Sequence, residues 1–218
     1  ATEAKENTVA LLQNADSDSA QEQQTDLTEP TDQPAPSPSP KAEGKVASSS
    51  GGMSKEMRAV WIYFSEMDKK ASSYSKWKDY IDKTFDTCKA NKMNTVILQV
   101  RPFADAMYPS KYYPWSKCAA GKAGRNPGFD PLKYAVSAAH KRGLDIQAWV
   151  NPYRITLPSM KFSSLPAGSI ARKWASSKKK SERRNVLKLD GAYYFNPASS
   201  QVQSLVANGV REIVNNYD

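Results

Sequence analysis

The fold is decided by residues 94–100, which have the sequence Asn94-Thr95-Val96-Ile97-Leu98-Gln99-Val100. This stretch is a nearly continuous apolar run with the length of one strand. Such runs are typical of strands in parallel sheets, which are covered on both faces. We therefore predict a buried strand at residues 94–100, which requires further strands at its edges and helices on its faces.

Strand and helix patterns alternate on either side of this stretch. Residues 57–64 form a short β-rich run, and apolar residues at helical spacing predict a helix over residues 75–91. A second helix is expected to begin with Asp130 as its cap and Pro131 in its first turn. This helix is expected to end at Gly143, because glycine tolerates the backbone conformation that follows a helix.

Residues 144–150 form the third predicted strand, and a third helix follows near the end of the chain. The helix is indicated by apolar residues spaced three and four apart, which are Val202, Leu205, Val206, Val210, Ile213, Val214 and Tyr217. Two long segments without a regular pattern, residues 102–129 and 151–198, follow the second and third strands. The order β-α-β-α-β-α predicts an α/β fold with a parallel sheet.

Both a doubly wound sheet and a (β/α)-barrel satisfy this order. The first predicted strand is not followed by a Gly-rich phosphate-binding turn, which counts against a nucleotide-binding sheet. The two long segments leave the sheet on one side, which is where barrel enzymes build their sites. The pattern therefore favours a barrel.

Residues 1–56 differ in composition from the rest of the chain. None of the 5 Trp, 11 Tyr and 6 Phe lies in them, and they contain a Pro/Ser run at 34–40 and a Ser/Gly run at 48–52. A segment this polar cannot bury enough apolar surface to offset the entropy lost on ordering. We therefore predict a disordered spacer over residues 1–56 and a folded domain over residues 57–218.

Charge divides the chain at the same place. Residues 1–56 carry 4 Lys and 10 Asp or Glu, a net −6, whereas residues 57–218 carry 27 Lys or Arg and 12 Asp or Glu, a net +15. A basic domain indicates an anionic partner, such as nucleic acid, a membrane surface or an acidic wall polymer, or else a solvated Lys-rich surface. The same two interpretations, solvated loop or attraction to a polyanion, apply to Lys178-Lys179-Lys180 with Arg183-Arg184. No nucleic-acid recognition motif is present, so we expect no nucleic-acid partner.

The chain has no apolar run of about 18 residues, so no membrane-spanning segment is expected. It has no initiator Met and no signal sequence, which is compatible with a cleaved leader. A Pro/Ser spacer ahead of a folded domain is common in exported proteins. We therefore expect an extracellular or cell-surface location in a bacterium.

Few residues of this chain suit metal binding or triad chemistry. The single His140 lies near a predicted helix end, where it would interact with the helix dipole. The two cysteines, Cys88 and Cys118, are expected to be free thiols rather than a disulfide. We expect neither a metal nor another cofactor.

The candidate binding residues lie at or after the carboxyl ends of the second and third strands. They are Arg101, Asp105, Tyr108, Trp115, Asn151, Tyr153 and Arg154. Trp115 and Tyr153 could stack on sugar rings, although packing in the core is the commoner use of aromatic residues.

Two of these residues have a structural alternative. Arg101 could clamp a substrate hydroxyl or carboxylate, or it could form an ion pair with Asp105. Asn151 could hydrogen-bond a sugar hydroxyl, or it could form a turn before Pro152. Glycoside hydrolysis normally needs two carboxyl groups, and the strand ends supply only Asp105.

Eight short stretches, in this order and spacing, resemble bacterial glycosyl-hydrolase-10-like (β/α)-barrel proteins. This family comprises exported and often lipid-anchored enzymes and includes a peptidoglycan glycan hydrolase. The matching stretches are residues 57–61 (MRAVW), 94–102 (NTVILQVRP), 105–110 (DAMYPS), 114–116 (PWS), 128–132 (GFDPL), 140–144 (HKRGL), 148–154 (AWVNPYR) and 195–197 (FNP).

The resemblance implies a (β/α)8 TIM barrel, of which this chain would hold about three βα units. It implies a pocket lined by Arg101, Asp105, Asn151, Tyr153 and Arg154. It also implies that the catalytic acids follow Asp218, in an Asp-Gly-x-x-x-Asp-Asp-Tyr motif on the fourth strand. One departure is Gln147, where the family often has His.

These features predict a glycoside hydrolase that acts on a polysaccharide, above all bacterial cell-wall glycan. The expected catalytic acids are absent from this chain, and the resemblance allows a lipid anchor that precedes residue 1. The alternative is a non-catalytic module that binds cell-wall glycan at the end of a flexible stalk.

Overall fold

The structure is a computed structural model that describes residues 56–68, 70 and 73–218. The predicted spacer lies, except for Glu56, outside the described residues. The described residues all belong to one compact unit, Gly51–Asp218. Among them, no helix is both long enough and apolar enough to cross a membrane.

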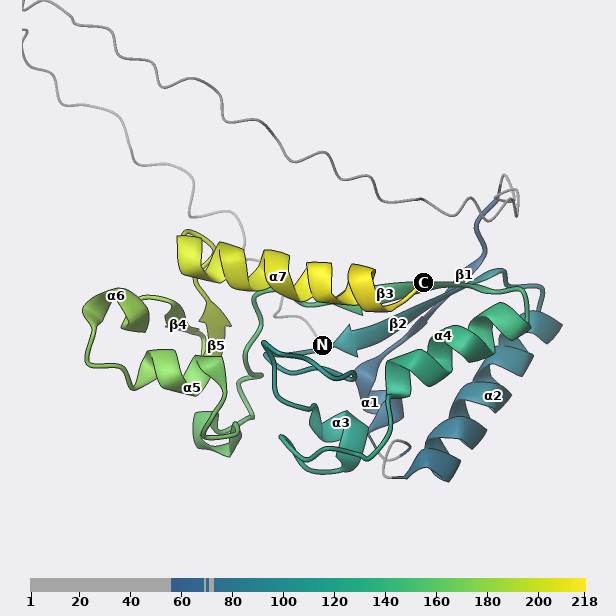
Figure 1. Cartoon of the computed structure of the whole chain (residues 1–218), viewed down its shortest axis with the longest axis horizontal. Helices are drawn as coiled ribbons and strands as arrows, with labels where there is room; N and C mark the ends of the chain where they lie inside the picture. Colours follow the sequence, from purple (N-terminus) through teal and green to yellow (C-terminus); the bar gives the residue numbers. More distant parts are fainter. Residues whose placement is uncertain (1–55, 69, 71–72) are drawn as a thin grey trace, which may run out of the picture. The chain divides into compact units, whose positions relative to one another are not determined.

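The centre of the fold is a parallel sheet of three strands in the order β1-β2-β3 (Figure 1). These strands are β1 (Ala59–Ile62), β2 (Thr95–Arg101) and β3 (Asp145–Val150). Every residue of β2 is buried, as its apolar sequence predicts. The α/β class and the parallel sheet are therefore confirmed, and the sheet is compatible with part of a barrel.

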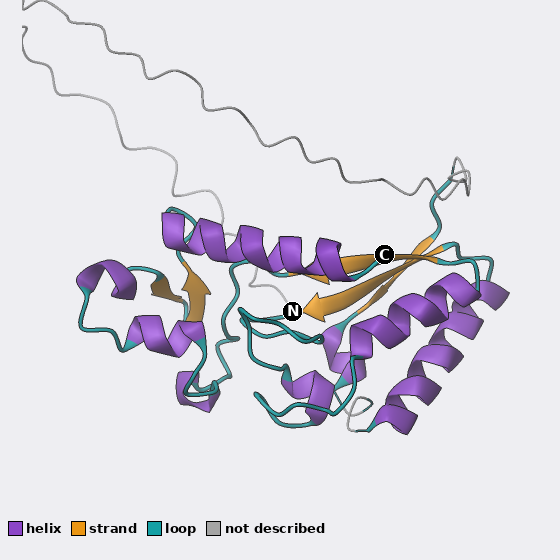
Figure 2. Ribbon diagram, in the orientation of Figure 1, coloured by secondary structure: helices purple, strands orange, loops and turns teal. Residues whose placement is uncertain are grey.

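Two helices cover one face of this sheet and lie side by side (Figure 2). They are α2 (Tyr74–Ala90) and α4 (Pro131–Lys141). The predicted start of α4 is confirmed, because the Asp130 carboxylate accepts a hydrogen bond from the Lys133 backbone N–H at 3.0 Å. The end is confirmed as well, since Gly143 has a φ of 62° just beyond the helix.

The first predicted strand is too long at its end. It stops at Ile62, and Phe64 begins the short helix α1 (Phe64–Met67). The change of direction is fixed by β2, because the Phe64 backbone N–H donates to Gln99 Oε1 at 3.1 Å. A second short helix, α3 (Lys117–Ala120), lies in the segment between β2 and α4.

The segment 151–198, predicted to be irregular, contains regular structure. It holds the 3-10 turn η1 (Phe162–Ser164), the helices α5 (Ile170–Ala175) and α6 (Lys180–Arg183), and an antiparallel hairpin of β4 (Val186–Leu189) and β5 (Ala192–Phe195). The hairpin turns at Asp190 and Gly191, whose φ values are 47° and 78°. A two-residue Asp-Gly turn of this kind fits the twist of a hairpin.

The last predicted helix is confirmed as α7 (Ser200–Asn216). It approaches the end of β2 closely at Gly209. A Cβ atom at Gly209 would lie 2.5 Å from Arg101 Nη1 and 2.7 Å from Tyr113 Cε2. Glycine is therefore required there by the close contact.

The sheet face opposite α2 and α4 is incompletely covered by the described residues. Trp61 is 59% exposed there and meets Trp149 edge to face, with ring centroids 4.9 Å apart. The outer edges of β1 and β3 have no strand neighbour among residues 56–218 as described. Apolar side chains are thus exposed on this face of the sheet, and backbone groups are unpaired along its two edges.

We predict that residues 57–218 expressed alone melt broadly and bind a hydrophobic dye. Open strand edges and exposed aromatic rings favour partly ordered or associated states. Thermal melting followed by circular dichroism, with dye fluorescence, tests this. A sharp two-state transition without dye binding would show that the three strands are sufficient for a stable domain.

We also predict that Gly209→Ala loosens α7. The added methyl group would collide with Arg101 and Tyr113, and overpacking of this kind costs about 1–3 kcal/mol. Backbone amides of α7 should then exchange with solvent roughly tenfold to hundredfold faster. Ser204→Ala, on the exposed side of the same helix, is the matched control and should leave exchange unchanged or slower. Equal exchange in both variants would contradict the prediction.

Candidate functional site

A cavity of about 530 Å³ lies where the loops after all three strands meet. Phe64 and Asp68 follow β1, Phe103 and Asp105 follow β2, and residues 157–166 follow β3. Because parallel strands end at the same edge of a sheet, their loops converge there. We call this hollow the Asp105 cavity.

Asp105 and Trp115 are the two predicted site residues that line this cavity. They are brought together by the loop between them, which folds back on itself. The Ala106 backbone N–H donates to Pro114 O at 2.9 Å, and the Ser116 N–H donates to Ala106 O at 2.8 Å. This bridge places a carboxyl group and an indole ring next to each other at the strand ends.

The environment of Asp105 is unusual for a carboxyl group. Burial among apolar walls raises the pKa of Asp105 to about 6 from an ordinary value of 3.8. Hydrogen bonds from the Ser116 hydroxyl and the Phe103 N–H, the latter at 3.1 Å, act in the opposite direction, as does the charge of Arg101. Desolvation outweighs them, so Asp105 can hold or release a proton near neutral pH.

A second carboxyl group, Asp68, also lines the cavity and was not predicted. Asp68 follows a four-residue helix rather than a strand, so strand-end reasoning passes over it. Its carboxylate pairs with Lys117 Nζ at 3.3 Å and lies 3.9 Å from Cys118 Sγ. Burial raises the pKa of the Cys118 thiol to about 12, so this thiol stays protonated and is not a nucleophile.

The remaining walls of the cavity are mostly apolar. Phe64 and Phe103 meet edge to face, with ring centroids 5.1 Å apart. The wall supplied by residues 157–166 includes Leu157, Met160, Leu165 and Pro166. A few polar groups within an apolar, aromatic hollow are typical of small-molecule and sugar sites.

Arg101 and Tyr108 lie away from the cavity. Both side chains are fully buried, and the Arg101 guanidinium lies 4.2 Å from the centre of the Tyr113 ring. Arg101 forms no hydrogen bond or ion pair with another described residue, so the alternative of an Asp105 ion pair is not observed. Neither side chain lines the cavity or is exposed among the described residues, and a substrate role for Arg101 and Tyr108 stays a prediction.

The Asn151 side chain is engaged within the fold, although not in the turn before Pro152 that was its alternative. Its amide donates to Pro102 O at 3.0 Å, and its Oδ1 accepts from Trp149 Nε1 at 3.1 Å. It therefore ties the ends of β2 and β3 together with both of its side-chain groups.

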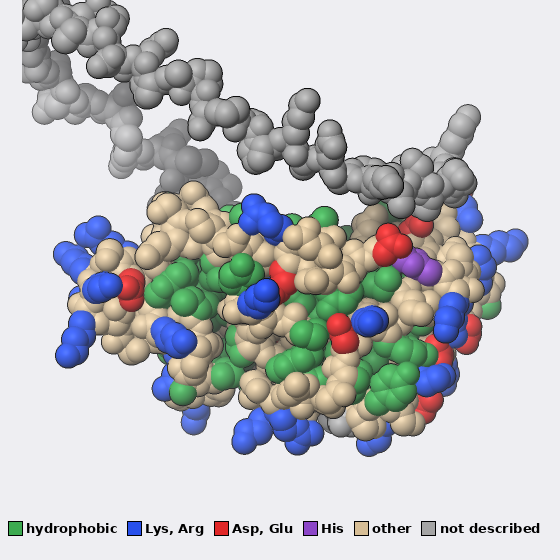
Figure 3. All heavy atoms as spheres, in the orientation of Figure 1, with side chains coloured by type: hydrophobic (Ala, Val, Ile, Leu, Met, Phe, Trp, Pro, Cys, Tyr) green, Lys and Arg blue, Asp and Glu red, His purple; other side chains and the backbone are tan. Residues whose placement is uncertain are grey.

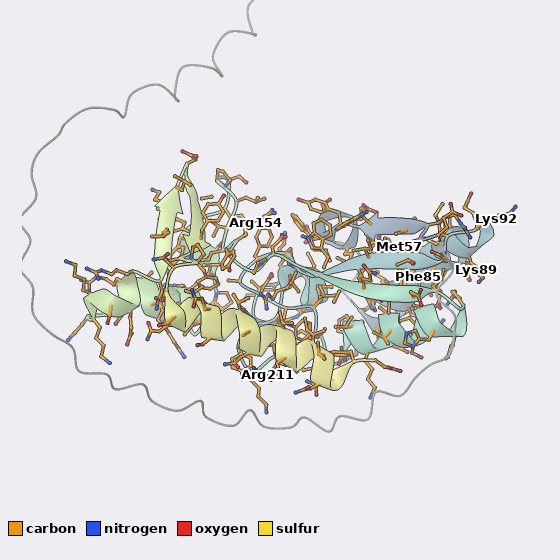
Figure 4. The ribbon with its side chains drawn as sticks, turned by 90° about the horizontal axis from the view of Figure 1, so that it is seen from above. Met57, Phe85, Lys89, Lys92, Arg154 and Arg211 are labelled. Atoms are coloured by element: carbon orange, nitrogen blue, oxygen red, sulfur yellow. The ribbon has the colours of Figure 1, made fainter. Side chains whose placement is uncertain are left out.

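Tyr153 and Arg154 lie beside the β4–β5 hairpin and outside the cavity lining (Figure 4). Tyr153 is 37% exposed, and the Arg154 guanidinium lies 6.0 Å from the centre of the Phe103 ring. Figure 4 shows Arg154 at the opposite end of the sheet from Lys89 and Lys92. A substrate role for these two residues stays a prediction.

The described residues offer little for metal binding or for thiol chemistry. Within residues 56–68, 70 and 73–218, no group of three His, Cys, Asp or Glu residues is placed to hold a metal ion. Cys88 and Cys118 are both free and buried, as expected. The arrangement thus offers acid–base and stacking groups.

We predict that one carboxyl group of the chain titrates near pH 6 and that this group is Asp105. Because its pKa is raised, Asp105 is neutral and protonated below that pH, and the cavity gains a negative charge above it. Carbon-13 NMR of Asp carboxyl groups as a function of pH measures this directly. The signal should disappear in Asp105→Asn and persist in Asp68→Asn, and its persistence in Asp105→Asn would contradict the assignment.

Known proteins similar to this chain carry related names. The family model described as Glycosyl hydrolase-like 10 matches residues 56–218. The chain is 34% identical over 171 residues to Glycosyl hydrolase YngK of Bacillus subtilis, covering 75% of this chain and 31% of that protein. It is 34% identical over 125 residues to Glycosyl hydrolase DigH of Escherichia coli, covering 57% of this chain and 28% of that protein.

The chain therefore spans about a third of the length of these relatives. The match to the family model covers the whole described domain, including the loops that form the Asp105 cavity. The chain belongs to the glycosyl hydrolase-like 10 family.

Proposed function

We propose that the protein to which this chain belongs is a glycoside hydrolase acting on bacterial cell-wall glycan. In this proposal, the Asp105 cavity forms one part of the substrate site. The observation that carries the proposal is the position of this cavity, which is built from the loops after three successive parallel strands. In barrel enzymes, the loops at this end of the strands form the active site.

The chemistry of the cavity suits a sugar. Trp115, which is half-buried, offers a ring face for stacking, and Asp105 offers a carboxyl group to sugar hydroxyls. With a pKa of about 6, Asp105 can accept a hydrogen bond when ionised and donate one when protonated. Its role in this proposal is to bind and orient the glycan.

The complete fold in this proposal is an eight-stranded barrel. The exposed Trp61 and the half-buried Trp149 lie on the sheet face that would become the barrel interior, and the open edges of β1 and β3 would receive further strands. We infer that the catalytic carboxyl groups follow Asp218 on the fourth strand. Glycoside hydrolysis needs two such groups around the scissile bond.

The substrate proposal includes a location. Cell-wall glycan lies outside the bacterial cytoplasmic membrane, so the enzyme would be extracellular or attached to the cell surface. A lipid anchor ahead of the acidic spacer would hold the domain near the wall.

The alternative is a module that binds wall glycan without cleaving it. One observation favours this alternative: the carboxylate of Asp68, the second carboxyl group of the cavity, is already paired with Lys117. That pairing leaves Asp105 as the cavity carboxyl group without a cationic ion-pair partner among the described residues. The two functions differ in one observable, which is the appearance of new reducing ends.

The test uses the complete protein and purified wall glycan. Trp115→Ala and Asp105→Asn should each lower kcat/KM about tenfold or more, because a stacked ring or charged hydrogen bond contributes roughly 1–3 kcal/mol. Tyr112→Ala removes an aromatic ring that is 37% exposed in the same loop but outside the cavity, and it should keep activity. Wild-type activity in all three variants would place the site elsewhere. Binding without reducing ends would favour the non-catalytic module.

A further inference from the structure

The segment from Lys178 to Lys188 has an unusual charge. It contains six basic residues and a single acidic residue, a net +5 over eleven positions. The basic residues, which we call the basic lobe, are Lys178, Lys179, Lys180, Arg183, Arg184 and Lys188. All six are exposed, and Figure 3 shows Lys and Arg gathered over the end of the molecule that carries α6.

The charge of the basic lobe is mostly uncompensated. Glu182, the acidic residue of the segment, pairs with Lys179 at 3.4 Å. No carboxylate among the described residues pairs with Lys178, Lys180 or Arg184. The helical layer beside the sheet differs, because Lys78 pairs there with Asp82 and Arg142 with Asp86. Clustered like charges repel, so the fold bears a cost that an anionic partner would relieve.

The segment that carries the basic lobe, for which a solvated loop and attraction to a polyanion were the two interpretations of the sequence, is tied to the rest of the fold. Arg183 Nη1 donates to the backbone oxygens of Ser177 and Lys178, both at 2.8 Å. Next to it, the buried Asn185 donates to Gln201 Oε1 at 2.6 Å, and its Oδ1 accepts from Ser199 at 2.5 Å. These bonds fix the backbone of the segment to the start of α7, so the backbone positions from which the cations project are defined.

The surface also lacks what a nucleic-acid site needs. Proteins bind single-stranded nucleic acid by interleaving cations with exposed aromatic rings that stack on bases. Trp174, close by in α5, is only 9% exposed and packs against Phe195. Leu187 and Leu189, the exposed large apolar residues next to the basic lobe, have no ring, and the Tyr193 ring is half-buried, with Lys188 Nζ 5.8 Å from its centre.

We propose that the basic lobe is a docking surface for a phosphodiester polymer of polyol or sugar units, of the kind carried by bacterial walls. Such a polymer presents closely spaced permanent negative charges and no bases. It matches cations that are one helical turn or less apart, as Lys180 and Arg184 are. Docking is separate from glycan hydrolysis, but the choice of a wall polymer rests on the cell-surface location that belongs to the proposed function.

The experiment measures binding of the full chain to synthetic poly(glycerol phosphate) over a series of salt concentrations. The triple variant Lys178→Gln, Lys180→Gln, Arg184→Gln should bind roughly tenfold to hundredfold more weakly at low salt. The slope of log K against log salt concentration should be less steep by about 2 for this variant, because binding of three fewer cations releases fewer counterions. Circular dichroism spectra that match the wild type exclude a folding defect.

The matched control is Lys76→Gln, Lys83→Gln, Lys89→Gln on α2, which removes the same charge from exposed positions. It should bind like the wild type. Equal weakening in both triple variants would overturn the proposal, because net charge alone would then explain binding. Equal or tighter binding of a polyuronate or of single-stranded DNA would overturn the phosphodiester assignment, and absence of wild-type binding would overturn the docking surface altogether.

Discussion

The complete burial of β2 is the constraint on which the described fold depends. All seven residues from Thr95 to Arg101 are buried, so each polar group among them must be accommodated inside the protein. Gln99 meets this demand in part, since its Oε1 accepts from the backbone N–H of Phe64, the first residue of α1, whereas its Nε2 has no partner among the described residues. Arg101 meets it in part by stacking on Tyr113 beneath α7, where only glycine at position 209 leaves room. The strand thereby helps to determine where α1 begins after β1 and how closely α7 can approach.

The parallel arrangement then determines the site. Three strands that run in one direction deliver three loops to one edge, and the Asp105 cavity forms between them. Since the loops contribute mainly apolar side chains, the carboxyl group of Asp105 is poorly solvated and its pKa rises to about 6. The cavity and the raised pKa of Asp105 therefore both result from the meeting of the three loops.

The sequence predicted those elements whose signals are local. The Asp130-Pro131 start of α4 and the apolar spacing of α2 and α7 act within one helix, and all three helices formed as expected. The segment 151–198 was misjudged because its short elements depend on contacts distant in sequence, such as Trp174 against Phe195. Its Asp190-Gly191 turn was the one local signal available.

The sequence predicted those site residues whose position follows directly from the end of a strand. Asp105 and Trp115 lie in the cavity, whereas Arg101 does not, although it ends the same strand. The reason is a register shift between Gln99 and Arg101, where Val100 and Arg101 together oppose Val150 of β3. One extra residue reverses the face to which the following side chain points, and a sequence pattern does not reveal such bulges.

The segment after β3 carries two surfaces, one apolar and one basic. Residues 157–166 form an apolar wall of the Asp105 cavity, and the basic lobe begins at Lys178. Among the charges of the described residues that act on Asp105, the cation is Arg101 and none belongs to the basic lobe. Salt screens interactions between exposed charges that are more than about 8–10 Å apart. A cationic surface nearer to the cavity would favour the ionised form of Asp105 and cancel part of the desolvation that raises its pKa. The separation therefore allows the protein to attract a polyanion while keeping a carboxyl group that titrates near neutrality.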